Sequence, residues 1–145
     1  MIEGLSLFKP PYSRITAIDL NKGEHRWMSP VGDGPRDHPL LKALNLAPLG
    51  ERLQGISVLV TKTLVFVGVI PAATPQSAIA ASVQKLLYVF DKDSGAPLHA
   101  IEMDAFSAAA PMTYMYRGRQ YVVVATGSGP TSELIALSLP PPAAK

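Results

Sequence analysis

Short apolar runs separated by polar turns recur along the chain, and two segments each hold a matched pair of them. Residues 57–69 carry two apolar runs around Thr61-Lys62-Thr63, and residues 112–127 carry two around Arg117-Gly118-Arg119. Paired runs rich in β-branched and aromatic residues around a short polar turn are typical of β-hairpins. The pattern therefore predicts one hairpin in each segment.

Three further segments resemble one another, and each reads as a short strand. They are "RITAIDL" from Arg14, "KLLYVFDK" from Lys85 and "ELIALSLP" from Glu133. Each predicted hairpin directly precedes one of these strands in the chain, apart from the intervening loop. The repetition indicates one structural unit used more than once.

Two of these strands end in the same kind of turn, an Asp followed four positions later by a Gly: Asp19 with Gly23, and Asp91 with Gly95. A carboxylate can accept backbone N–H bonds across such a turn, and Gly can take positive φ where the chain reverses. Trp27 follows the first turn, where its large flat ring can pack against a neighbouring unit. We interpret these residues as structural rather than catalytic.

The complete unit is a hairpin, a loop, a strand, an Asp–Gly turn and a last strand. Ser138 takes the Asp position in the third copy, 47 residues after Asp91 (138 − 91), which suits a propeller blade of ~40–50 residues. The sequence thus predicts an all-β fold with one full blade, roughly residues 56–103, and two partial blades of four-stranded antiparallel sheet. Because propellers close with ~4–8 blades, we expect residues 1–145 to be the C-terminal portion of one larger propeller, with no internal boundary.

The first spacing between Asp positions is longer and requires insertions, at residues 32–55 and 70–84. Within the first insertion, "DHPLLKAL" predicts a short helix that Asp37 would cap, with Pro39 in its first turn.

Composition narrows the classes of protein and of chemistry that are open to the chain. Apolar residues make up 48% of the chain and 14 residues are proline, which favours a loop-rich globular β protein. The formal net charge is only +2, and the scattered cations argue against a nucleic-acid partner. Without cysteine, thiolate chemistry and disulfides are excluded. The first 14 residues lack the basic segment and apolar stretch of a secretory signal, which leaves export open for a longer protein.

The long loops are expected on one face. In a propeller blade, the loop between the second and third strands opens on the same side as the loop to the next blade. The loops at 9–13, 70–84 and 127–132 are of the first kind, and those at 32–55 and 104–111 are of the second. Long loops gathered on one side indicate a binding face.

Two loop features on that face are candidates for ligand contact. Lys9 is either a solvated loop lysine or a partner for an anionic ligand. The loop that contains Gly127, Ser128 and Gly129 precedes a strand rather than a helix, so it does not fit a phosphate-binding loop. Its glycines could instead let the backbone approach a flat ligand closely.

Other candidate sites are weaker. Asp91, Asp93 and Glu102 match calcium-loop positions, but Ala96 stands where the sharp turn needs Gly. The three histidines lack metal-ligand spacing; His25 and His99 are expected at the surface. His38, in the first insertion, belongs either to a polar loop or to the mouth of a site.

Several stretches together resemble the C-terminal end of the pyrroloquinoline quinone (PQQ)-dependent dehydrogenases, in the group of membrane-type glucose and alcohol dehydrogenases. They are "LFKPPYSRITAIDLNKGEHRW", "VLVTKTLVFVG", "LLYVFDKDSG" and "APMTYMYRGRQYVVVATG". The pattern from Ala17 to Trp27 is similar to the repeat motif of that family, in which the Trp docks between blades. Two departures stand out: His99 occupies the Trp position of the second turn, and Gln54 stands where related alcohol dehydrogenases have a Trp near the cofactor.

The resemblance implies an eight-bladed propeller that binds PQQ on its axis, with calcium held by upstream blades. An alcohol or an aldose such as glucose would be oxidised by hydride transfer to PQQ, and electrons would pass to a quinone or a cytochrome on the periplasmic side. It implies cofactor contacts from Lys9, Gln54, Gly55, Gly127, Ser128 and Gly129, with no catalytic residue and no metal ligand in this chain.

Two other functions compete with a dehydrogenase. One is a non-catalytic scaffold of the PQQ-repeat type, which assists outer-membrane assembly. The other is a self-standing β protein that oligomerises to cover its edges. The stretch "PMTYMYRGRQYVVVATG" favours the dehydrogenase. We expect the 145-residue chain to show no dehydrogenase activity by itself with added PQQ and calcium.

Overall fold

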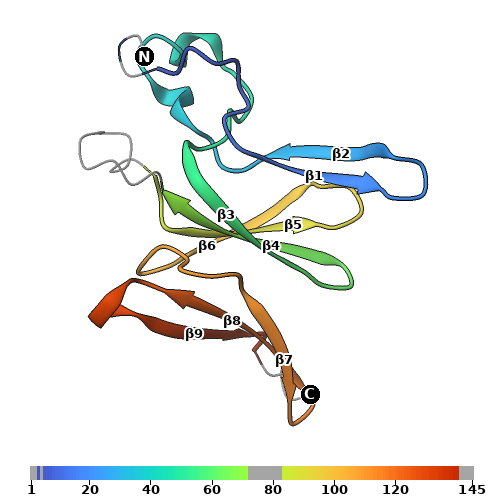
Figure 1. The fold of residues 1–145 in the computed structure, drawn as a ribbon. Helices are drawn as coiled ribbons and strands as arrows, with labels where there is room; N and C mark the ends of the chain where they lie inside the picture. Colours follow the sequence, from blue (N-terminus) through green and yellow to red (C-terminus); the bar gives the residue numbers. More distant parts are fainter. Residues whose placement is uncertain (1–2, 4, 72–82, 141–145) are drawn as a thin grey trace.

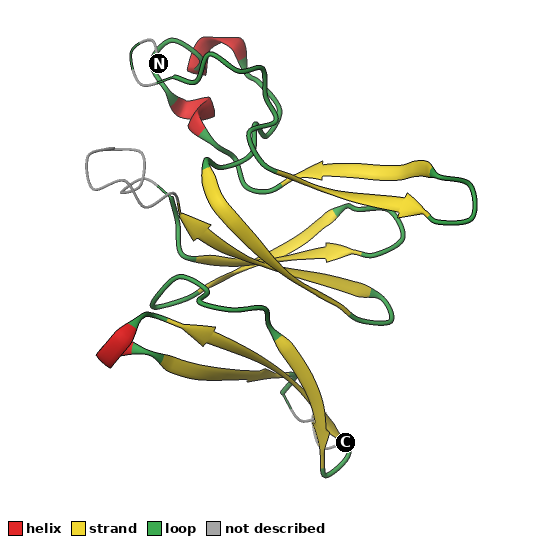
Figure 2. Cartoon of the chain, viewed as in Figure 1, coloured by secondary structure: helices red, strands yellow, loops and turns green. Residues whose placement is uncertain are grey.

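The computed structural model describes residues 3, 5–71 and 83–140. These residues form three antiparallel β-sheets and three short 3-10 helices, and the described part of the chain contains no α-helix. Figure 2 shows strands and loops with only brief helical turns. The all-β prediction is confirmed.

The sheets follow one another in chain order, so each is built from consecutive strands. The first sheet pairs β1 (Arg14–Asp19) with β2 (Glu24–Pro30). The second sheet has the order β3 (Leu53–Val60), β4 (Leu64–Pro71), β5 (Leu86–Asp91) and β6 (Pro97–Glu102). The third sheet has the order β7 (Met112–Tyr116), β8 (Arg119–Thr126) and β9 (Glu133–Ser138).

Both predicted hairpins are present, as β3–β4 and β7–β8, and the second sheet is the complete four-stranded blade expected at residues 56–103. The predicted insertion at 70–84 lies mostly outside the described residues.

The three sheets are stacked one upon another (Figure 1), and apolar side chains pack between neighbouring sheets, as the blades of a propeller require. Alternation along β4 explains how one strand serves two interfaces: Val65 and Val67 belong to the core against the first sheet, and Phe66 to the core against the third. The first core also holds Ile15, Val31 and Phe90, whereas the second is built around Leu87, Val122 and Val124. Because both faces of the inner strands β4 and β5 are covered, these two strands are almost continuously apolar.

Loops of two kinds separate onto two edges of this stack (Figure 1). The long-loop edge, toward the left and top of the view, carries residues 31–52, 103–111 and 127–132. The tight-turn edge, toward the right and bottom, carries residues 20–23, 61–63, 92–96 and 117–118. This separation follows from the up-and-down connection of each sheet, and it agrees with the single face predicted for the long loops.

The Asp residues cap the turns as predicted. The Asp19 Oδ1 accepts hydrogen bonds from the N–H groups of Asn21 and Lys22 at 3.0 and 3.3 Å. Asp91 Oδ1 accepts bonds from the N–H groups of Asp93 and Ser94 and from the Ser94 hydroxyl. These bonds hold the pKa of the Asp91 carboxyl below its usual value, with the Ser94 hydroxyl as the largest cause.

Trp27 joins the first sheet to the second. Its indole Nε1–H donates a 3.0 Å hydrogen bond to the backbone carbonyl of Lys92, and the ring lies against Gly95. A Cβ at Gly95 would stand 2.5 Å from Trp27 Cδ2, so only glycine fits beneath the ring. The Ser29 hydroxyl adds a short hydrogen bond to the Gly95 carbonyl. The prediction of an inter-blade Trp is confirmed.

The helix predicted within "DHPLLKAL" is wrong. Two 3-10 helices stand there instead, η1 (Pro35–Asp37) and η2 (Lys42–Leu44), and Asp37 ends the first without capping a helix. The backbone instead closes short turns, in which the Leu41 and Lys42 N–H groups donate to the His38 carbonyl and the Leu44 N–H donates to the Leu41 carbonyl, and Asn45 in the left-handed region ends the second of them.

The segment before β1 also differs from prediction. Residues 9–13 were expected to link two strands of the first partial blade, but no strand of the described residues precedes Arg14. A third short 3-10 helix, η3 (Gly129–Thr131), lies in the loop between β8 and β9. Within the described residues, no helix combines the length and the apolar character needed to cross a membrane.

Candidate functional site

Three chain segments meet at one junction on the long-loop edge. The N–H groups of Leu49, Gly50 and Glu51 donate to the carbonyls of Asp33, Gly32 and Val31 at 2.7–3.1 Å. These bonds pair residues 31–33 with residues 49–51 and close the long loop between the first and second sheets at its base. Residues 31–51 are called the closed loop below. The segment before β1 completes the junction, because the Tyr12 N–H donates to the Leu49 carbonyl and the Val31 N–H donates to the Ser13 carbonyl.

Glycines make this close approach possible. Gly32, Gly34 and Gly50 all have positive φ, between 64° and 81°, a region that other residues adopt at a cost. A Cβ at Gly50 would collide with the Ser13 backbone, and one at Gly34 would collide with the Gly50 carbonyl. Glycine at these positions, including both glycines of the sequence "GDG", therefore allows the backbones of these segments to pass in direct contact.

Two ionisable side chains flank the junction. Glu51 is half-buried, and its Oε1 accepts a 3.1 Å hydrogen bond from the Gly34 N–H. Burial raises the pKa of the Glu51 carboxyl, partly offset by that hydrogen bond. Burial, reinforced by the charge of Glu51, raises the pKa of Tyr88 to about 12. Both groups contact Gly32: a Cβ there would stand 2.5 Å from Glu51 Cγ and 2.7 Å from the Tyr88 hydroxyl.

An apolar groove of about 870 Å³ lies beside this junction, between the closed loop and strands β5 and β6 of the second sheet. Pro10, Pro11 and the segment from Leu46 to Leu49 form one side, and Tyr88 and Phe90 contribute to the other. Lys9 directly precedes this wall and is exposed. Its side chain does not line the groove, and no contact among the described residues connects it with the other predicted site residues.

The predicted glycine loop lies on the same edge. Gly127 has a φ of 76°, and a Cβ there would strike the Thr131 carbonyl, so the loop's own geometry requires glycine. Gly129 has a φ of 55°, but the space where its Cβ would stand is open to 4 Å. Ser128 is exposed between them. Only Gly129 thus presents a bare backbone that a flat ligand could approach.

Hydrogen bonds join this loop to the second sheet. The Gly127 N–H donates to the Phe106 carbonyl at 3.1 Å, and Ser107 bridges Thr126. The Ser107 and Ser57 hydroxyl oxygens lie 3.2 Å apart in a buried contact. This contact connects the glycine loop with the start of β3, two residues from Gly55.

The structure therefore gathers most of the predicted site residues along one edge. Gln54 is exposed on β3, and Gly55 pairs with Ile70, with room for a Cβ. Sequence reasoning missed Glu51, Tyr88 and the Ser57–Ser107 contact. The spaced glycines at 32, 34 and 50 were the available signal for the junction, whereas nothing in the sequence links Ser57 with Ser107.

Consecutive antiparallel sheets that pack face to face, with Trp27 joining the first sheet to the second, define a partial β-propeller. The glucose/ethanol/alcohol dehydrogenase β-propeller family, designated PQQ, matches residues 1–122. The chain belongs to this family.

Curated relatives agree with that assignment. The chain is 29% identical over 126 residues to the glycerol dehydrogenase large subunit of Gluconobacter thailandicus. It is 30% identical over 127 residues to the quinate/shikimate dehydrogenase (quinone) of Acinetobacter baylyi, and 27% identical over 124 residues to quinoprotein glucose dehydrogenase A of Acinetobacter calcoaceticus. Each match covers 86% of this chain but only 14–15% of the relative. No solved structure shows a significant match to the chain.

The described residues bring no three His, Asp or Glu side chains together as metal ligands. The donors that they do offer on the long-loop edge are an ammonium, a primary amide, a hydroxyl and open backbone, from Lys9, Gln54, Ser128 and Gly129. A planar, anionic cofactor such as PQQ needs such groups around its rim.

Proposed function

We propose that this chain supplies the C-terminal blades of a PQQ-dependent dehydrogenase that oxidises an alcohol or an aldose of the glucose type. The observation that carries the proposal is the family match over residues 1–122, and the long loops that carry Lys9, Ser128 and Gly129 lie on one edge of the stacked sheets (Figure 1). The relatives named above act on glycerol, quinate or glucose by their names, so a polyhydroxylated substrate is the common class.

The chain's own residues would bind and orient the cofactor. Lys9 would pair with a carboxylate of PQQ, and Gln54 and Ser128 would donate hydrogen bonds to its oxygens. Gly129 would let the ring approach the backbone, Gly127 would shape the loop that carries it, and Gly55 would offer a bare backbone on β3. When bound, PQQ supplies the acceptor for a hydride and its two electrons.

The remaining parts of the site would come from outside this chain. The chain spans about one seventh of the length of its curated relatives, so the acidic base and the calcium ligands are assigned to upstream blades. Electrons would leave to a quinone or a cytochrome, and the longer protein would work in the periplasm or on the periplasmic face of the inner membrane.

A non-catalytic propeller scaffold is the second candidate. The Trp27 contact with Gly95 favours a propeller of either kind, since it holds blades together without reference to a ligand. The exposed donors on the long-loop edge favour the enzyme, because a scaffold needs no such cluster.

Dye-linked dehydrogenase assays separate these functions. A longer protein, in which the coding sequence upstream of Met1 is joined to this chain, is assayed with PQQ, calcium and glucose, glycerol or quinate. We expect PQQ-dependent dye reduction by the longer protein and none by the 145-residue chain. Absence of PQQ-dependent turnover in a folded longer protein would support the scaffold, and turnover by the short chain would contradict the need for upstream blades.

A further inference from the structure

The second and third sheets meet differently from the first and second. His99 and Trp27 are equivalent in register, because Trp27 pairs with Ala17 and His99 with Val89, each two residues before the turn Asp. Trp27 is half-buried against the second sheet, whereas His99 is exposed. The interface that lacks the indole ring has an open groove on the tight-turn edge.

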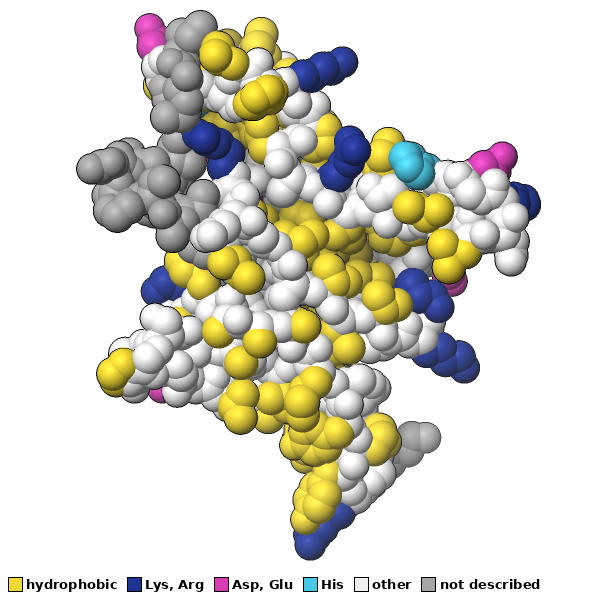
Figure 3. Space-filling model, in the orientation of Figure 1, with side chains coloured by type: hydrophobic (Ala, Val, Ile, Leu, Met, Phe, Trp, Pro, Cys, Tyr) yellow, Lys and Arg dark blue, Asp and Glu magenta, His cyan; other side chains and the backbone are white. Residues whose placement is uncertain are grey.

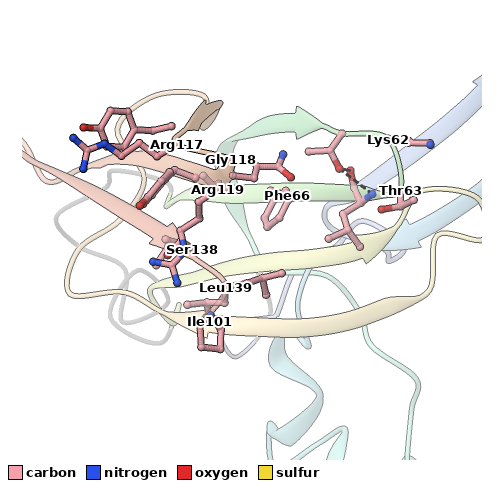
Figure 4. Close-up of a pocket in the computed structure, with 17 residues that line it drawn as sticks. Lys62, Thr63, Phe66, Ile101, Arg117, Gly118, Arg119, Ser138 and Leu139 are labelled. Carbon is pink, nitrogen blue, oxygen red and sulfur yellow. Dashed lines mark hydrogen bonds between the residues drawn. The ribbon is translucent and has the colours of Figure 1, made fainter. Parts of the chain in front are cut away.

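This groove of about 1000 Å³ lies between the two sheets (Figure 4). Apolar side chains from both sheets form its floor, namely Phe66, Ile101, Val122 and Leu137. The same residues belong to the core between these sheets, so the groove is the outward continuation of that core. A fourth strand beside β9 would extend the third sheet and would not enter the space between sheets.

The charged residues among the described lining of the groove are all cations. Lys62 stands on the β3–β4 turn, with Arg117 and Arg119 across from it on the β7–β8 turn (Figure 4). None of the described lining residues is acidic. Within the described part of the chain, the one ion pair is Arg36 with Asp33, far along the chain from this groove. None of the three cations therefore forms an ion pair with another described residue.

The turn itself presents its cations outward. Arg117 and Gly118 both have positive φ, at 48° and 75°, as expected of a tight two-residue hairpin turn. Arg117 lies 5.1 Å from the centre of the Tyr116 ring, an arrangement that orders the guanidinium. In Figure 3, hydrophobic side chains follow β7 toward this turn, where Lys and Arg side chains stand at the tip.

We propose that this groove, between the tight turns of the second and third sheets, binds an acidic polypeptide segment of a partner protein. An apolar side chain of such a segment matches the floor, and its carboxylates match the cations of the two turns. A second copy of the chain fits poorly, because its formal net charge is +2. The groove lies opposite the long-loop edge, so the partner would leave the proposed cofactor face free.

The test uses the 145-residue chain and a defined probe, the fluorescein-labelled hexapeptide Glu-Asp-Leu-Glu-Trp-Asp. Binding is followed by fluorescence anisotropy, and amide shifts of the 15N-labelled chain locate the contact. We expect saturable binding that weakens with salt, with shifts at residues 61–64 and 117–122. The double variant Arg117→Glu/Arg119→Glu is expected to weaken binding at least about tenfold. Lys62→Glu, on the other side of the groove, is expected to weaken it as well.

A matched control reverses two exposed cations elsewhere. Arg14→Glu/Arg26→Glu makes the same change in net charge on the first sheet, and we expect less than about a threefold effect from it at physiological salt. Equal weakening by both double variants, or shifts centred away from the groove, would overturn the proposal. So would a hexapeptide of Glu alone that binds as well as the probe, since the apolar floor would then have no role. Absence of saturable binding, or dimerisation through the groove in sedimentation experiments, would also overturn it.

Discussion

Gly95 and Gly23 give a matched pair that isolates the energy of the Trp27 contact. They occupy the same position in the two Asp–Gly turns, with φ of 72° and 71°, and each donates its N–H to the carbonyl of the turn Asp. Their surroundings differ. The Cβ position of Gly23 has nothing within 4 Å, whereas that of Gly95 is occupied by the Trp27 ring.

The magnitude follows from these two environments. Gly23→Ala pays only for a Cβ at positive φ, about 1–2 kcal/mol. Gly95→Ala has the same backbone cost and also overpacks the interface, which adds about 1–3 kcal/mol. The ring cannot simply retreat, because its Nε1–H is bonded to the Lys92 carbonyl at 3.0 Å. We therefore expect Gly95→Ala to lower the free energy of unfolding by about 2–5 kcal/mol.

Urea unfolding followed by far-UV circular dichroism measures both costs on one scale. Trp27→Ala supplies the coupling test, since removing the ring should remove most of the excess cost of Gly95→Ala over Gly23→Ala and leave only the contact with the Ser29 hydroxyl, 2.9 Å from the Cβ position. The emission of Trp27, the chain's single Trp, should shift in Gly95→Ala and remain unchanged in Gly23→Ala. Equal costs for the two glycine variants, or an excess cost of Gly95→Ala that persists in full without the ring, would refute the assignment of Trp27 as an inter-blade lock.

Three further predictions concern the turns and loops. The pKa of Glu51 is raised in the folded state, so ionisation of its carboxyl opposes folding. The free energy of unfolding should therefore fall as pH rises from the unfolded-state pKa through the folded-state pKa. Glu51→Gln should remove that pH dependence in urea titrations at pH 4 to 7. The pKa of Asp91 is lowered, so its stabilisation is present above the unfolded pKa and should disappear as pH falls through the folded one; Asp91→Asn should flatten the acid limb of thermal unfolding. Gly127→Ala should destabilise the chain by about 2–4 kcal/mol, since its Cβ would strike the Thr131 carbonyl. Gly129→Ala should cost only about 1–2 kcal/mol. Chemical denaturation that ranks the two variants in the reverse order would contradict the loop geometry.

The sequence was informative where structure is decided locally. Apolar runs on both sides of Thr61-Lys62-Thr63 predict the β3–β4 hairpin, because strand propensity and turn chemistry act over a few residues. The Asp19 and Asp91 caps were equally predictable, since each carboxylate bonds to N–H groups within three residues of itself. Repetition of these local signals then identified the blades.

Prediction failed where distant segments decide the outcome. The leucines of "DHPLLKAL" have a spacing that suits a helix, but pairing of residues 31–33 with 49–51 fixes the ends of this loop. Glu51 accepts a hydrogen bond from Gly34, which is 17 residues away in the sequence. It also acts electrostatically on Tyr88, which is farther away in the sequence. Such contacts depend on how sheets stack, which no short sequence window contains.

Amide shift mapping with PQQ tests the central claim most directly. The 15N-labelled chain is titrated with PQQ and calcium, and the glycine amides of the two edges are compared. The account predicts shifts at Gly55, Gly127 and Gly129, on the long-loop edge, with Gly23 and Gly118 unchanged. Shifts centred on Gly118 and the tight-turn edge would contradict a cofactor face built from the long loops.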